Sequence, residues 1–205
     1  MRKFAVLGLT LGLLLSWALT DRAFAVTIYT DKTVWENAVG WQFETEDFTD
    51  DTLNDGVSYT ASESGIINIT NGYYQDVLKS SSANEPQTTW NFNPSITGYI
   101  QAYGGNWDLG GPGGGGNNLL VYVNDPDNPE SYTQVGTISY TFKGGFWGFI
   151  SPTPFTSVRL IGGTGDHQQN YYLDNMVYSP VPVPGTLGLL SGGLLGLLAI
   201  RRFML

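Results

Sequence analysis

Aromatic side chains are the residues of this sequence that offer the most direct chemistry. Trp107 stands between Asn106 and Asp108 in a predicted glycine-rich loop, and a flat ring beside hydrogen-bonding groups can stack on the apolar face of a sugar. Three tyrosines are further candidates for the same ligand contact: Tyr103, Tyr73 and Tyr74. The alternative for such rings is a place in the core or in cross-strand pairs, which we expect for Trp35 and Trp147.

A catalytic site is much harder to assemble from these residues. His167 is the only imidazole and directly follows Asp166, but sequence neighbours rarely have the geometry of a Ser–His–Asp triad. No Gly-x-Ser-x-Gly nucleophile elbow is present in the sequence. A glycosidase needs only two carboxylates about 5 to 9.5 Å apart, and the many acids leave that option open. We therefore predict no catalytic residues, with a secreted glycoside hydrolase or lyase as the less favoured alternative.

Two acidic clusters and one glycine-rich run invite a ligand interpretation. The acids are Asp47, Asp50, Asp51 and Asp55 in one cluster, and Asp125, Asp127 and Glu130 in the other. Neither cluster has the spacing of an EF-hand calcium loop, so we interpret both as solvated loop acids. The run 110–116 leads into a strand and lacks the Gly-Lys-Ser/Thr of a phosphate-binding loop. It is therefore expected to be a flexible loop.

The composition excludes several classes of function. The 205 residues include eighteen Asp and Glu, nine Lys and Arg, and no Cys. Without Cys there are no disulfides, thiolate metal sites or thiol catalysis. The net charge of −9 argues against nucleic acid as a partner. The charge is also uneven, because residues 26–180 hold seventeen acids and four bases, a net charge of −13.

The elements that must position these residues are mostly strands. Short β-branched and aromatic runs alternate with Gly, Asn, Asp and Pro. After a short strand at 27–29, the runs that we predict as strands are 41–48, 57–60, 65–70, 88–92, 96–103, 119–123, 137–142, 146–150, 157–161 and 171–178. A helix is expected over 31–38, with Asp31 as its N-cap and Val34, Trp35 and Ala38 on one face. The pattern predicts an all-β fold, a jelly-roll-like antiparallel β-sandwich over residues 26–179.

The first 25 residues predict a secretory signal peptide. A basic start precedes the apolar run 4–19, and Ala23 and Ala25 form an A-x-A cleavage site. The alternative is an uncleaved membrane anchor. Cleavage by signal peptidase, after export through the Sec translocon, would leave a mature chain that begins at Val26.

The C-terminal residues 180–205 form a second processing segment in three parts. A short motif over 181–186 comes first, an apolar segment over 187–200 follows, and Arg201 and Arg202 end the segment. The residues that define the motif are Val181, Pro182, Val183, Pro184 and Gly185. This order resembles the PEP-CTERM sorting signal of Gram-negative bacteria, although Val183 stands where that family usually has Glu.

The resemblance implies a location and a set of partners. The segment 187–200 would be a transmembrane helix that anchors the chain in the inner membrane before processing, with the final arginines on the cytoplasmic side. An exosortase-type peptidase would then release the domain to the cell surface or the extracellular matrix. We expect a non-enzymatic cell-envelope or matrix protein associated with extracellular polysaccharide. The alternative is a carbohydrate-binding module acting on exopolysaccharide.

The middle of the chain shows a second resemblance. The segments 35–40, 45–48, 145–150 and 153–158 are similar to an ectodomain that recurs in PEP-CTERM proteins. The segment 171–178 is similar to the last strand of carbohydrate-binding jelly rolls. In several of those families an early carboxylate and the Asp of the last strand share a structural Ca²⁺. The resemblance implies that role for Glu46 or Asp47 together with Asp174.

Overall fold

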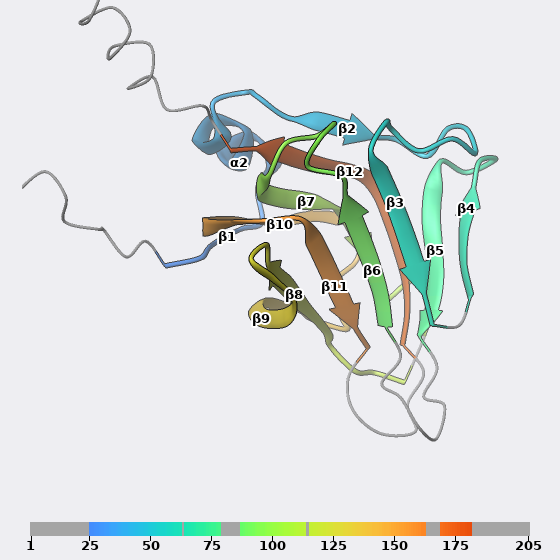
Figure 1. Cartoon of the computed structure of the whole chain (residues 1–205). Helices are drawn as coiled ribbons and strands as arrows, with labels where there is room; N and C mark the ends of the chain where they lie inside the picture. The colour runs from blue at the N-terminus through green and yellow to red at the C-terminus, as the bar shows by residue number, and fades with distance from the viewer. Residues whose placement is uncertain (1–24, 63, 79–86, 114, 163–168, 182–205) are drawn as a thin grey trace, which may run out of the picture.

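The protein is a sandwich of two antiparallel sheets (Figure 1), seen in a computed structural model that describes residues 25–62, 64–78, 87–113, 115–162 and 169–181. Within these residues one helix lies against the outer side of the larger sheet. The predicted antiparallel β-sandwich is confirmed.

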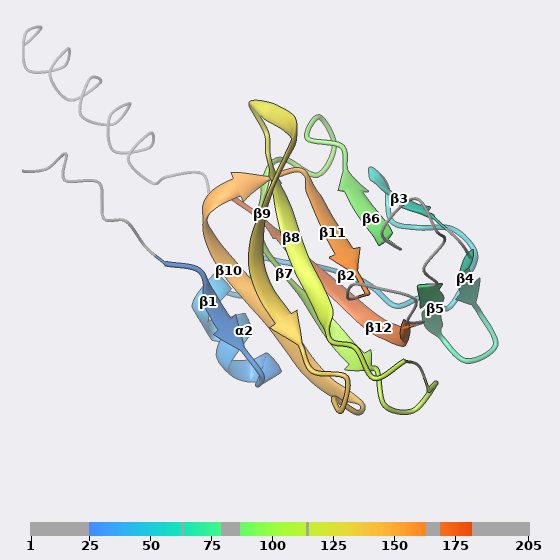
Figure 2. The same cartoon turned by 90° about the horizontal axis from the view of Figure 1, so that it is seen from below.

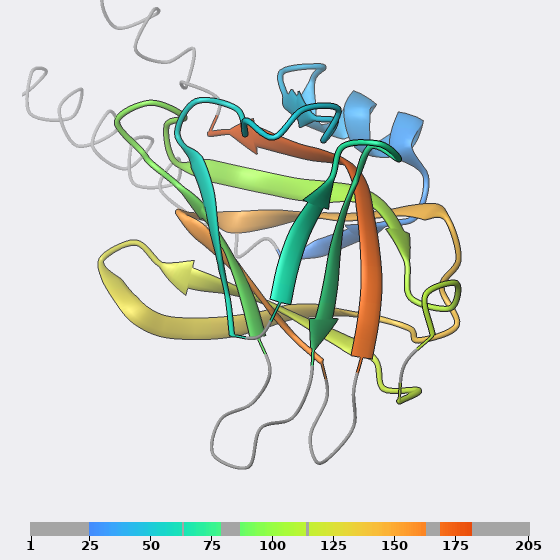
Figure 3. The same cartoon turned by 90° about the vertical axis from the view of Figure 1, so that its right-hand side faces the viewer.

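The larger sheet has seven strands in the order β1–β10–β7–β12–β5–β4, with β2 paired to one end of β12. Its strands are β1 (Thr27–Tyr29), β2 (Glu44–Glu46), β4 (Ser64–Asn68), β5 (Tyr73–Leu78), β7 (Ile100–Asp108), β10 (Gly145–Phe155) and β12 (Gln169–Pro180). Figure 3 shows β12, β5 and β4 side by side at one edge of this sheet.

The smaller sheet has five strands in the order β3–β6–β11–β8–β9. Its strands are β3 (Val57–Ala61), β6 (Gln87–Phe92), β8 (Leu119–Asp125), β9 (Asn128–Ile138) and β11 (Ser157–Ile161). Figure 2 shows β9, β8 and β11 side by side in this sheet. Because side chains alternate along each strand, every strand sends one row into the core and one row outward.

The core between the sheets is unusually aromatic. Its largest fully buried side chains include Trp90, Trp107, Tyr74, Tyr103 and Tyr171. Neighbouring rings meet at centroid distances such as 4.9 Å between Tyr74 and Trp90 and 5.6 Å between Trp107 and Tyr171. Such pairs add favourable ring–ring contacts to the burial of apolar area. The aromatic content of the sequence is therefore used largely for packing.

The helix α2 (Lys32–Val39) begins and ends at residues with clear local signals. The carboxylate of Asp31 accepts a hydrogen bond from the Val34 amide at 3.1 Å, and Gly40 ends the helix with φ of 73°. This confirms the predicted N-cap. The expected apolar face is wrong in part, because only Trp35 is buried and Val34 is 53% exposed. A helix of two turns rests on the sheet through one large side chain.

Several strand predictions were wrong in position. The strand β5 was missed, β7 runs over 100–108 rather than 96–103, and β9 covers 128–138 rather than 137–142. In β9 most side chains are exposed and polar, because it is an edge strand held mainly by its ladder with β8. Periodicity of apolar residues cannot reveal such a strand.

No helix in the part of the chain that the structure describes is long and apolar enough to cross a membrane. The predicted transmembrane segment 187–200, most of the signal peptide and the sorting motif from Pro182 onward lie outside that part. Val26, the predicted first residue of the mature chain, is half-buried and packs against the main core.

Candidate functional site

The structure corrects three of the four predicted ligand-binding residues. Trp107, Tyr103 and Tyr74 are each 0% exposed, so none of these rings can stack on a sugar at the surface. Trp107 lies on β7 rather than in a loop, and its Nε1 donates a hydrogen bond to the Trp147 carbonyl oxygen at 3.1 Å. The glycines before it also belong to this strand. Gly104 is needed there because a Cβ at this position would stand 2.9 Å from the Gly148 Cα.

Tyr73 is the predicted ligand residue that reaches the surface. It lies half-buried on the outer face of the larger sheet, and its ring stacks on that of Tyr172 with centroids 4.4 Å apart and planes inclined by 28°. Desolvation, the Tyr73 hydroxyl and Asp108 raise the pKa of Tyr172. Each ring of this pair therefore covers one face of the other.

The three residues predicted to hold calcium differ in their surroundings. Glu46 is buried, and its two carboxylate oxygens accept hydrogen bonds from the Phe48 amide at 2.9 Å and the Asn54 amide at 2.7 Å. The side chain therefore secures the loop between β2 and β3. This gives Glu46 a structural function that needs no metal.

Asp47 and Asp174 lie close enough to influence each other. Hydrogen bonds from Thr49 lower the pKa of Asp47. Partial burial raises the pKa of Asp174, and the negative charge of Asp47 adds to that effect. Among the residues that the structure places, no group of three or more His, Asp or Glu side chains could hold a metal. Calcium binding by these two carboxylates stays a prediction.

Carboxylates of both acidic clusters accept hydrogen bonds within local turns, which agrees with their interpretation as loop acids. The Asp50 carboxylate accepts a hydrogen bond from the Thr52 amide at 2.8 Å, and Asp125 accepts one from the Asp127 amide at 3.0 Å. Both are Asx-type contacts that stabilise local loops. His167 and Asp166, the residues considered for catalysis, lie outside the described residues.

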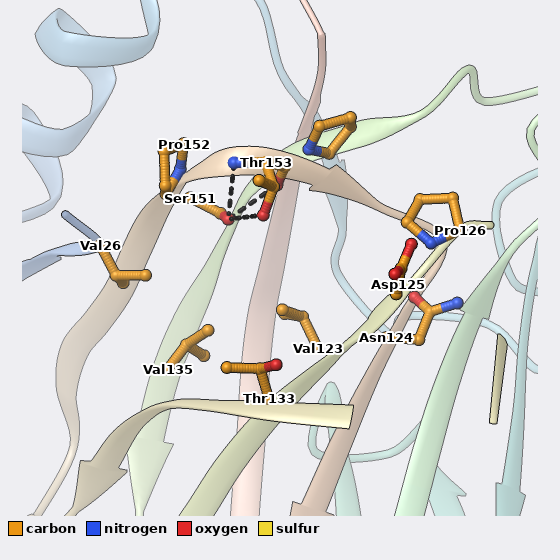
Figure 4. A pocket seen from close by; sticks show the side chains of 11 residues that line it. Val26, Val123, Asn124, Asp125, Pro126, Thr133, Val135, Ser151, Pro152 and Thr153 are labelled. Carbon is orange, nitrogen blue, oxygen red and sulfur yellow. Dashed lines mark hydrogen bonds between the residues drawn. The ribbon is translucent and has the colours of Figure 1, made fainter. Parts of the chain in front are cut away.

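A hollow of about 390 Å³ lies where β8 and β9 meet the bend of β10 (Figure 4). Valines and prolines form much of its lining. The Ser151 hydroxyl donates a hydrogen bond to the Thr153 carbonyl oxygen at 2.7 Å and accepts one from the Thr153 amide at 3.2 Å. The polar groups of Asn124 likewise bond to Thr156 and Ser157. These polar groups are already used to hold the bend, which favours a structural interpretation of this hollow.

A second hollow, of about 440 Å³, has a lining better suited to a polar ligand. The tyrosines Tyr99 and Tyr132 line it together with the amide of Asn91 and the carboxylate of Glu130. Tyr99 is 49% exposed. The Tyr132 hydroxyl lies 2.8 Å from the Ser157 hydroxyl, a hydrogen bond that fixes the position of its ring.

This second hollow continues onto the outer face of the smaller sheet. We call the Arg159 face a set of six side chains on the outer side of β6, β8, β9 and β11, which are Thr89, Asn91, Tyr122, Tyr132, Gln134 and Arg159. Arg159 lies at the centre, because it pairs with Thr89 on one side and Tyr122 on the other. Its guanidinium carbon stands 3.5 Å from the centroid of the Tyr132 ring.

Sequence patterns offered little indication of the Arg159 face. Tyr132 and Arg159 are far apart in the chain and meet only because β8 lies between β9 and β11. The one usable signal was the alternation in β8, where Tyr122 stands between the buried residues Val121 and Val123. That alternation predicts an outward tyrosine.

Comparisons with known proteins find similarity by structure alone. No protein-family model matches the chain, and no curated protein matches it. Among solved structures it is similar to CBM29_1, a family 29 carbohydrate binding module from Piromyces equi, with 12% identity, a TM-score of 0.50, and coverage of 67% of this chain and 89% of that one.

Two variants of CBM29-2, another family 29 carbohydrate binding module, are similar to the same extent. One is complexed with cellulohexaose and the other with mannohexaose. Each is 11% identical and has a TM-score of 0.50, with 68% of this chain and 92% of the other covered. At this identity the likeness shows that the chain shares the β-sandwich fold of these modules.

Proposed function

We propose that this chain is an exported, non-enzymatic protein that binds polysaccharide on the Arg159 face and in the hollow beside it. The observation that carries the proposal is the pairing of Tyr99 and Tyr132 with the amide of Asn91 around that hollow. Similarity in fold to modules complexed with cellulohexaose and mannohexaose supports it.

The chemistry of the lining suits a sugar chain. Tyrosine rings offer flat apolar surface to the CH groups of a sugar ring, while amides and hydroxyls exchange hydrogen bonds with its hydroxyls. The supporting residues lie largely on strands, and Tyr132 is held by Ser157. A surface that is already ordered loses little entropy on binding, which favours affinity.

Binding can be tested by electrophoresis of the purified full-length chain through native gels that contain hydroxyethylcellulose or glucomannan. Retardation should weaken about tenfold in Tyr132→Ala and Tyr99→Ala, because each removes one stacking surface. The matched control is Tyr73→Ala, which removes an aromatic ring from the other sheet and should bind as the wild type does. Equal retardation of all four proteins would refute the proposal. So would the absence of retardation of the wild type by these neutral polysaccharides and also by carboxymethylcellulose and cellulose sulfate.

We further propose that the C-terminal segment directs the protein to the cell surface or the extracellular matrix. The supporting observation is the order of the motif 181–186, the apolar segment 187–200 and two arginines. A tag placed after the last residue should be lost from the mature protein in a strain with active exosortase. A tag that stays attached would argue against cleavage.

A further inference from the structure

Charge is distributed very unevenly between the two faces of the sandwich. The strands of the smaller sheet contain two acids, Asp125 and Glu130, and both lie at the β8–β9 hairpin end. The outward residues of its central strands are uncharged except for Arg159. The larger sheet and its helix carry outward acids on β2, β7, β12 and α2, whereas Asp76 on β5 is buried between the sheets. Arg159 is thus a basic centre on an otherwise uncharged region of an acidic domain.

Arg159 also makes no ion pair among the residues that the structure places. The one salt bridge there joins Lys32 to Glu36 at 3.9 Å. The guanidinium of Arg159 rests on the Tyr132 ring, and its buried Nε has no hydrogen-bond partner. A cation–π contact fixes the position of a guanidinium without using its N–H donors. The N–H donors of the two terminal nitrogens, Nη1 and Nη2, remain available to a ligand.

We propose that the polysaccharide bound on the Arg159 face is anionic, and that Arg159 binds a carboxylate or sulfate group of the sugar chain. This inference rests on the proposed function and adds the class of its ligand. A guanidinium offers paired N–H donors that match the oxygens of such groups. A neutral sugar would leave the charge of Arg159 without an anionic partner on this face.

The acidity of the rest of the domain does not prevent such binding. At physiological ionic strength the Debye length is about 8 Å, so acids on the opposite sheet act weakly at this face. Glu130 lines the hollow beside Tyr132 and is the acid that a ligand would meet. We expect it to repel the anionic group and so to direct that group toward Arg159.

Three polymers that share a β-1,4-glucan chain provide the test. Hydroxyethylcellulose is neutral, carboxymethylcellulose carries carboxylates, and cellulose sulfate carries sulfate esters. We expect the full-length chain to bind at least one anionic polymer about tenfold more tightly than the neutral one, equivalent to about 1.4 kcal/mol. The polymer that is preferred identifies the anionic group. The preference should decline as salt is raised from 0.05 to 1 M.

The variants separate this inference from the proposed function. Arg159→Gln should lose the preference for anionic polymers yet still bind hydroxyethylcellulose, which also shows that the variant is folded. Lys143→Gln removes the same charge from an exposed residue outside the face, and should keep the preference. Equal binding of all three polymers, or a preference that Arg159→Gln retains, would overturn this inference alone. Failure to bind any of them would overturn the proposed function as well.

Discussion

Replacing Trp107 by Phe is expected to lower the free energy of unfolding by about 2.5 kcal/mol. The substitution removes about two buried carbon atoms, and the burial of each contributes about 0.8 kcal/mol to stability. It also removes the hydrogen bond from Nε1 to the Trp147 carbonyl oxygen, a contribution of about 1 kcal/mol. For a domain of this size the sum corresponds to a fall in Tm of about 5 to 10 °C.

The measurement is urea unfolding of the purified chain followed by circular dichroism, with polysaccharide binding measured on the same samples. The matched control is Trp41→Phe, because Trp41 also donates a hydrogen bond, to the Asn37 carboxamide at 3.1 Å, but is 59% exposed. It should change stability by less than about 1 kcal/mol. An unchanged stability of Trp107→Phe together with weaker polysaccharide binding would show that Trp107 is a surface ligand residue and would refute this reasoning.

Two further predictions concern buried polar groups. Glu46→Gln should lower the free energy of unfolding in urea by about 2 kcal/mol, because the side-chain NH₂ of Gln would face a backbone N–H that now donates a hydrogen bond to the carboxylate. An unchanged urea midpoint would contradict this role of Glu46. Stability should also fall above pH 10, by about 1.4 kcal/mol per pH unit for each buried tyrosine, since burial raises the pKa in the folded state and only the unfolded chain then ionises. The tyrosines concerned are Tyr74, Tyr103 and Tyr171. Urea midpoints that stay constant from pH 9 to 11, or absorbance at 295 nm showing these groups ionised in the folded protein, would contradict the prediction.

Local signals in the sequence predicted part of the fold well. The N-cap at Asp31 was found because capping depends on residues three positions apart. Strands formed by short β-branched and aromatic runs, such as β6 and β11, were also placed closely. In each case the residues that determine the structure are near one another in the chain.

The errors arise where distant segments decide the structure. The glycines before Trp107 indicated a loop, yet they are required because β10 approaches β7 closely at Gly104. The strand β9 is polar because it lies at an edge, and only its pairing with β8 makes it a strand. The contact of Arg159 with Tyr132 depends on the order of three strands. No local pattern could have predicted it.

The central claim is that polysaccharide binds on the outer face of the smaller sheet. Amide chemical shifts of the isotope-labelled protein, followed during titration with cellulohexaose, test it most directly. We predict that the perturbed amides fall on β6, β8, β9 and β11, with the largest changes near Asn91, Tyr132 and Arg159. Changes centred on Tyr73 and Tyr172 in the larger sheet, or no changes at saturating sugar, would contradict the account.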